Sequence, residues 1–98
     1  MTEKLEIKDV YVYALGYCIL KDSTSIAMIQ RLMKIHYALA SMAVDWMEQN
    51  GYVTPFTGKA PRKVLLSLEQ YKEKFNDILN KKKLIYKKYE KDLQSLIN

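Results

Sequence analysis

Residues 25–66 constrain the fold of this chain more than any other stretch. Ser25 precedes an apolar run, which is a preferred helix start, and Gly51 follows a second such run, where a left-handed cap favours a residue without Cβ. Two short runs of strand-favouring residues, 52–54 and 64–66, then flank a loop that holds both prolines of the chain. This stretch therefore predicts a helix, a tight turn, a second helix and a two-stranded hairpin.

The segment before this stretch supplies another helix. Residues 8–20 are densely apolar, and valine and tyrosine within them also favour strands. The length of the run favours a helix, and Asp9 near its start suits the positive end of a helix dipole. We expect the second helix, capped by Ser25 or Ser23, to run from residue 25 to about residue 34, and the third helix to span residues 37–50. Three helices and a hairpin predict a mainly α fold, the winged helix-turn-helix, with the wing at residues 55–61.

The pattern of residues 67–98 predicts one long amphipathic helix, because neither glycine nor proline interrupts it. Its apolar side chains lie close to one stripe: Leu68, Phe75, Leu79, Tyr86, Tyr89, Leu93 and Ile97. Such a helix must bury its stripe against its own domain, a second copy of the chain or another protein. We favour a homodimer contact, and we divide the chain into a winged-helix domain at 1–66 and a dimerisation or packing helix at 67–98.

The net charge of +5 is unevenly distributed along the 98 residues. Residues 1–58 hold five basic and six acidic groups, whereas residues 59–98 hold eleven basic and five acidic groups. The excess positive charge therefore belongs to the predicted wing and tail. Such a distribution fits a polyanionic partner, and it fits ordinary solvated helices equally well.

The sequence gives no support for an enzyme. His36 is the only histidine and has no metal-ligand neighbours, and Asp45 and Glu48 share a helix without a partner base, so neither a metal nor a catalytic site is predicted. No phosphate-binding loop occurs, and no cofactor or small-molecule site is evident. The single cysteine, Cys18, fits a reducing compartment. With no signal peptide or membrane span visible, we expect a cytoplasmic protein.

A set of residues in register points to a known family. They are Asp9, Tyr11 and Ala14 in the first helix, Ser25, Gln30 and Arg31 in the second, Ile35 and Tyr37 about the turn, Ala40, Asp45, Met47, Glu48, Gly51 and Val53 through the third helix, and Pro55, Gly58, Pro61, Arg62, Val64 and Leu65 in the hairpin. In these positions the chain resembles the gamma domain of FtsK/SpoIIIE-type DNA translocases. The resemblance implies a winged helix that binds double-stranded DNA. Because no motor sequence accompanies it, we expect a stand-alone relative.

The predicted DNA contacts combine charge with this resemblance. Cations of the second helix and of the hairpin are the best candidates for phosphate contacts, and ordinary surface charge is their alternative role. The predicted DNA-contacting residues are Gln30, Arg31, Lys34, Tyr37, Ser41, Lys59, Arg62 and Lys63.

The third helix departs from the family pattern. The family has a polar Asn-Arg pair where this chain has Ala38 and Leu39, and Met42 and Trp46 replace further polar residues. Leu39, Met42 and Trp46 would share the face that enters the major groove, where Arg and Asn supply most base readout. This stripe needs cover from the tail, a second copy or another protein, unless the helix is rotated and the stripe is core. The predicted interface residues are Leu39, Met42, Trp46, Phe75, Leu79, Tyr86, Tyr89 and Leu93.

Two functions remain open from the sequence. The first is a non-enzymatic, dimeric protein that binds double-stranded DNA mainly through backbone phosphates, with weak or altered base specificity. The second is a protein-interaction module that keeps the winged-helix fold and docks through its third helix and its C-terminal helix.

Overall fold

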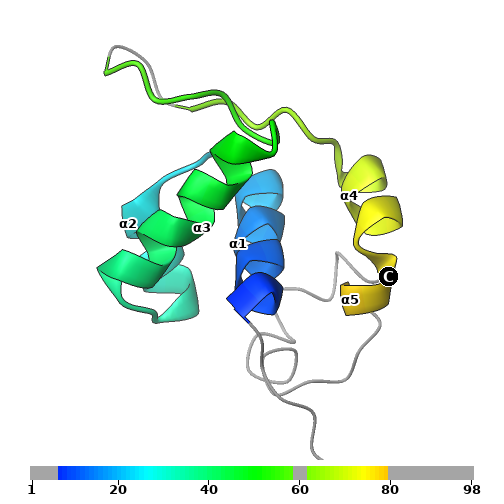
Figure 1. Ribbon diagram of the computed structural model, residues 1–98, viewed down its shortest axis with the longest axis horizontal. Coiled ribbons are helices and arrows are strands. Elements are labelled where there is room, and N and C mark those ends of the chain that lie inside the picture. The colour runs from blue at the N-terminus through cyan, green and yellow to red at the C-terminus, as the bar shows by residue number, and fades with distance from the viewer. Residues whose placement is uncertain (1–6, 59–61, 80–98) are drawn as a thin grey trace, which may run out of the picture.

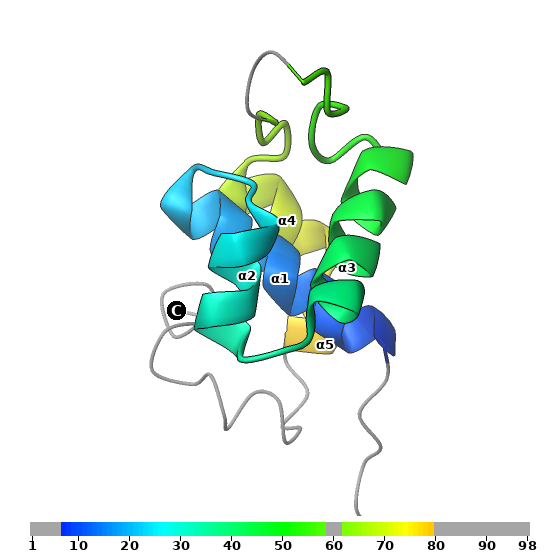
Figure 2. The same ribbon diagram turned by 90° about the vertical axis from the view of Figure 1, so that its left-hand side faces the viewer.

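The computed structural model of the chain describes residues 7–58 and 62–79, and these residues are mainly helical. The helices are α1 (Ile7–Lys21), α2 (Ile26–Met33), α3 (Tyr37–Gln49), α4 (Leu68–Lys74) and α5 (Asn76–Leu79). The bounds of α1, α2 and α3 lie within one residue of those predicted. The α2 and α3 helices pack on one side of α1, and α4 and α5 lie on the other side (Figures 1 and 2).

The central helix α1 is buried on nearly all sides, because almost every position in it is apolar. Nine of its 15 residues are buried, and Val12, Ala14 and Leu15 are fully shielded from solvent. A helix that is apolar all round needs neighbours on every side. The fold supplies them by placing α2, α3 and α4 against it.

Helix caps set the connections around α2 and α3. The Ser25 hydroxyl accepts a hydrogen bond from the Met28 amide at 3.2 Å, which confirms the predicted start of α2. Lys34 ends α2 in the left-handed conformation, with φ at 54°, and its amide donates to the Gln30 carbonyl. Gly51 follows α3 with φ at 74°, which confirms the predicted left-handed position.

The predicted two-stranded hairpin does not form as regular strands within the described residues. Residues 52–58 and 62–66, which we call the first and second arm, are joined by an isolated antiparallel bridge between Val53 and Val64. The Thr54 amide donates to the Lys63 carbonyl at 2.9 Å, and the Lys63 amide donates to the Thr54 hydroxyl at 2.8 Å. Pairing stops there because Pro55 has no amide donor. The arms project beyond the C-terminal end of α3 (Figure 1).

The prediction of one uninterrupted C-terminal helix is also wrong in the described part. Phe75 separates α4 from α5, with φ at −110° and ψ at 24°. Hydrogen bonds from Phe75 to Tyr71 and from Leu79 to Phe75 continue across the break, so it is a local distortion. The remainder of the predicted helix, residues 80–98, lies outside the described residues.

An aromatic cluster ties this tail segment to the rest of the fold. The Trp46 ring of α3 lies 5.8 Å from Tyr11 of α1, 5.3 Å from Tyr52 of the first arm and 5.9 Å from Phe75, centroid to centroid. Tyr71 of α4 is fully buried, and its hydroxyl donates to the Val12 carbonyl at 2.7 Å. The predicted boundary at residue 67 therefore does not separate two cores, because α4 shares the core of α1.

We predict that Phe75→Ala lowers the free energy of unfolding by about 3–5 kcal/mol, because it empties a buried site in this cluster. Phe56→Ala is the matched control, since Phe56 is 63% exposed on the first arm, and it should cost less than about 1 kcal/mol. Urea unfolding of both full-length variants measures the two losses. Equal losses would contradict the packing of α4 onto α1 and α3.

A second prediction concerns high pH. Burial raises the pKa of Cys18 from 9.0 to about 12, against a lowering hydrogen bond from Thr24. The folded chain therefore keeps a proton that the unfolded chain releases, so stability present below pH 9 is lost as the pH rises toward 12. Cys18→Ala should fall less steeply with pH between 9 and 12 than the natural chain in urea titrations. Parallel curves would contradict the shielding of this thiol.

Candidate nucleic-acid interface

The third helix presents one open side to solvent. Its inner side consists of the fully buried Ala40, Ala43, Val44 and Met47. The opposite side, which we name the outer face of α3, consists of Tyr37, Ala38, Ser41, Met42, Asp45 and Gln49. On this face Tyr37 is 62% exposed and Met42 is 48% exposed. A helix-turn-helix offers such a face of its second helix to the major groove.

The predicted apolar stripe of α3 is split between two environments. Met42 lies in the middle of the outer face, whereas Leu39 and Trp46 are half-buried on the flank and pack against the core. Trp46 is covered by Tyr11, Tyr52 and Phe75 of the same chain. The expectation that all three residues face a groove is therefore wrong, and the alternative of a rotated helix holds for Leu39 and Trp46.

The exposed cations of this region lie at the two ends of α3 rather than on its outer face. Arg31 is exposed in the last turn of α2, and Lys34 is exposed at the cap of that helix, three residues before α3 begins. Lys63 is exposed on the second arm, which is paired with the segment that follows α3. The outer face itself carries Asp45 as its single charged side chain. The exposed cations and the helix surface between them are thus chemically distinct.

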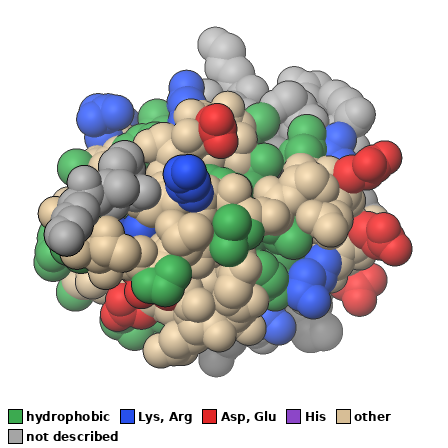
Figure 3. Space-filling view, turned by 90° about the horizontal axis from the view of Figure 1, so that it is seen from above, with side chains coloured by type: hydrophobic (Ala, Val, Ile, Leu, Met, Phe, Trp, Pro, Cys, Tyr) green, Lys and Arg blue, Asp and Glu red, His purple; other side chains and the backbone are tan. Residues whose placement is uncertain are grey.

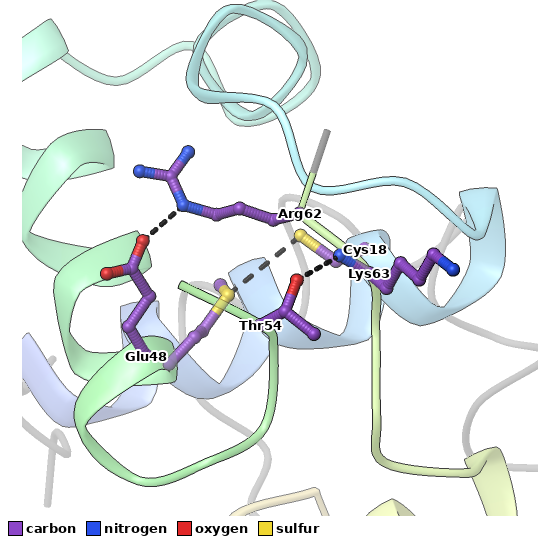
Figure 4. Close-up of polar contacts among 6 residues, drawn as sticks. Cys18, Glu48, Thr54, Arg62 and Lys63 are labelled. Atoms are coloured by element: carbon purple, nitrogen blue, oxygen red, sulfur yellow. Dashed lines mark hydrogen bonds and ion pairs between the residues drawn. The ribbon is translucent and has the colours of Figure 1, made fainter. Parts of the chain in front are cut away.

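Arg62 joins the second arm to α3 (Figure 4). Its Nε donates to Oε1 of Glu48 in an ion pair whose side chains are 16% and 24% exposed. The Arg62 guanidinium also lies 5.0 Å from the ring centroid of Phe56 on the first arm. Arg62, predicted as a DNA contact, is therefore already occupied by an acid of α3 and an aromatic ring. Its contacts hold the arms against the helix.

The remaining predicted residues fall into three groups. Gln30 and Ser41 are half-buried, and they lie on α2 and on the outer face of α3. Phe75 and Leu79, predicted at an interface, are 6% and 5% exposed because the chain buries them in its own core. That prediction is therefore corrected for this pair. The rest lie outside the described residues: Lys59, Tyr86, Tyr89 and Leu93.

Two aromatic residues were missed by the sequence reasoning. Tyr71 is buried and bonded to α1, and its signal was its spacing between Leu68 and Phe75 on one helical stripe. Phe56 is exposed on the first arm beside Arg62, and its signal was an aromatic residue between the glycine and proline of a predicted loop.

Elsewhere on the described residues, we searched for a pocket, a metal site and a membrane-spanning helix. A hollow of about 590 Å³ lies between the start of α1, the end of α3 and the α4–α5 junction. The charged residues that line it are Lys8, Asp9, Lys74 and Asp77. Within residues 7–58 and 62–79, no group of three or more His, Cys, Asp or Glu side chains could hold a metal ion. In the same ranges, no helix has the length and apolar character needed to cross a membrane.

The face seen from the side of the arms has a mixed character (Figure 3). Basic, acidic and apolar side chains are interspersed among its coloured residues, and none of the three kinds forms a single dominant patch there. An anionic ligand on this face would therefore contact separate cations and not a continuous basic surface.

Comparison with known proteins assigns this chain to a family. Residues 6–67 match the Ftsk gamma domain, a span that runs from the start of α1 to the end of the second arm. The chain belongs to the FtsK gamma domain family. It is 38% identical over 65 residues to the DNA translocase SpoIIIE of Bacillus subtilis (strain 168), and 36% identical over 69 residues to the DNA translocase FtsK of Halalkalibacterium halodurans.

These matches cover most of this chain and little of the relatives. The matched segments amount to 66% and 70% of this chain, but to 8% and 9% of the two translocases. The family domain is therefore a small part of those proteins. The α4–α5 segment follows the part that the FtsK gamma domain family matches.

Proposed function

We propose that this FtsK gamma domain binds double-stranded DNA mainly through backbone phosphates, with the outer face of α3 toward the major groove. The observation that carries the proposal is the placement of exposed cations at both ends of that helix. Arg31 and Lys34 precede it, and Lys63 lies on the arm beyond it. Cations in such positions contact phosphates and fix the register of a helix on the duplex.

The proposal describes a non-enzymatic cytoplasmic protein whose partner is DNA. Its affinity would come from neutralised phosphates, since the outer face of α3 has no cation for a bidentate guanine contact. We further propose that the chain forms a homodimer through the apolar residues Tyr86, Tyr89 and Leu93. Phe75 and Leu79 are not part of this proposed contact, because they are buried within one chain.

A second candidate function has its own observation. The outer face of α3 combines an acid with the exposed apolar side chains of Tyr37 and Met42. Such a mixed surface suits docking of a protein partner better than it suits a phosphate backbone. Under this alternative, substitution of Arg31, Lys34 or Lys63 would leave the affinity for the protein partner unchanged.

The proposed function predicts a salt-dependent affinity for duplex DNA. Fluorescence anisotropy of a labelled duplex across a series of salt concentrations should show the logarithm of the binding constant falling with the logarithm of salt. Lys63→Ala should reduce this slope by about 0.9, the contribution of one phosphate contact. Lys74→Ala, on α4, is the matched control and should leave the slope unchanged. Absence of binding at low salt, or binding that is indifferent to salt, would contradict the proposal.

The ion pair between Arg62 and Glu48 generates a further prediction. Glu48→Gln removes the charge that holds Arg62 and makes its guanidinium available to a phosphate, so affinity should rise and the salt slope should steepen by about 0.9. Glu73→Gln, at an exposed position of α4, removes the same charge outside the ion pair with Arg62. An equal gain in both variants would show that net charge alone acts, and would contradict a role for the pair.

A further inference from the structure

We propose that the hollow between the start of α1, the end of α3 and the α4–α5 junction binds a small zwitterion that carries an aromatic ring. A free aromatic amino acid and a short peptide with such a residue share this chemistry. The proposal goes beyond DNA binding and does not depend on it, because none of the residues that line the hollow is a predicted DNA contact.

The hollow has the size and the aromatic lining of a small-molecule site. Its volume of about 590 Å³ lies within the range of roughly 300–1,000 Å³ that is typical of ligand pockets. Trp46, Tyr52 and Phe75 line it, and their ring centroids lie 5.3 to 5.9 Å apart in pairs. Trp46 is half-buried, so it keeps surface that a ligand ring can cover in an edge-to-face or offset arrangement.

The charged residues of the hollow have both signs on two of its sides. The start of α1 contributes Lys8 and Asp9, and the α4–α5 junction contributes Lys74 and Asp77. These four charges cancel, so the lining favours neither a simple anion nor a simple cation. Within residues 7–58 and 62–79, the exposed Lys8, Lys74 and Asp77 enter no ion pair. They are therefore available to a ligand that has both an ammonium and a carboxylate group.

Each charged side chain has a matching group on such a ligand. The ammonium groups of Lys8 and Lys74 only donate hydrogen bonds, so they would bind the carboxylate of the ligand. The carboxylate of Asp77 only accepts, so it would bind the ammonium group of the ligand. Asp9 is 1% exposed and adds negative charge to the wall of the hollow. Its attraction for the ligand ammonium is strengthened by the lower dielectric of a buried position.

One side of the hollow comes from outside the family domain. Residues 6–67 match the FtsK gamma domain, whereas Lys74, Phe75, Asp77 and Ile78 follow that span. These four residues supply one cation, one acid and one of the three aromatic rings. The complete lining therefore depends on the α4–α5 segment, and the proposed site is a property that the family domain does not supply by itself.

The test uses Trp46, the only tryptophan of the chain, as a reporter of the hollow. Titration of the full-length chain with L-phenylalanine should change the Trp46 emission and saturate. Three analogues each lack one recognised group: L-alanine lacks the ring, 3-phenylpropionate lacks the ammonium group and phenethylamine lacks the carboxylate. Each should bind about tenfold more weakly than L-phenylalanine. The dipeptide phenylalanylglycine is the last arm, and the tighter of the two zwitterions identifies the ligand as a free amino acid or a peptide.

Variants assign the binding to the hollow. Lys74→Gln and Asp77→Asn should each weaken L-phenylalanine binding about threefold to fivefold, because each removes one exposed charge, and both should fold normally because the two positions are exposed. Glu73→Gln, at an exposed position of α4 outside the lining, is the matched control and should bind like the natural chain. The proposal is overturned if L-phenylalanine and phenylalanylglycine both leave the Trp46 emission unchanged, if the analogues bind as tightly as L-phenylalanine, or if the three variants lose affinity equally. DNA binding is measured separately, so none of these results affects the proposed function.

Discussion

The packing of Trp46 is the interaction on which the rest of the structure depends. Its ring contacts Tyr11 of α1, Tyr52 of the first arm and Phe75 between α4 and α5, and so joins α3 to three other segments of the chain. Aromatic side chains bury large areas and hold defined mutual geometries. Seating this ring against α1 fixes the rotation of α3 about its axis. Every residue that α3 shows to solvent follows from that rotation.

The rotation of α3 separates the apolar side chains of the predicted stripe into a flank group and an exposed residue. Trp46 and Leu39 turn inward to the flank, where they add to the core, and Met42 is left outside among polar neighbours. Charge is separated in the same way, because the exposed cations lie at the ends of α3 while Asp45 occupies its outer face. A protein with this arrangement can hold a duplex by its phosphates at two places and bring an apolar, hydrogen-bond-accepting surface to the bases between them.

The sequence predicted what local chemistry controls. The length of an apolar run predicted α1, and the signals at Ser25 and Gly51 predicted the start of α2 and the end of α3. The rotation of α3 was not predictable in this way, because its inner side is built largely from small residues such as Ala40 and Ala43, whose periodic signal is weak. The prediction relied instead on the large apolar side chain of Trp46, so the predicted exposed face included the flank on which Trp46 lies.

Tertiary packing explains the other differences. No glycine or proline marks the break at Phe75 in the sequence. The break lies where the Phe75 side chain enters the aromatic cluster. Residues 52–54 and 64–66 have strand-favouring side chains, yet Pro55 limits their pairing to one bridge. The occupation of Arg62 by Glu48 depends on how the arm meets α3 in space, which residue types and spacing do not reveal.

The central claim is that DNA meets the outer face of α3 and the cations at its two ends. The most direct measurement is an NMR titration of the isotope-labelled chain with duplex DNA, which follows each backbone amide. The account predicts the largest shift changes on the outer face of α3, at the end of α2 and on the second arm. Changes confined to the start of α1 and the α4–α5 junction, with α3 unperturbed, would contradict it.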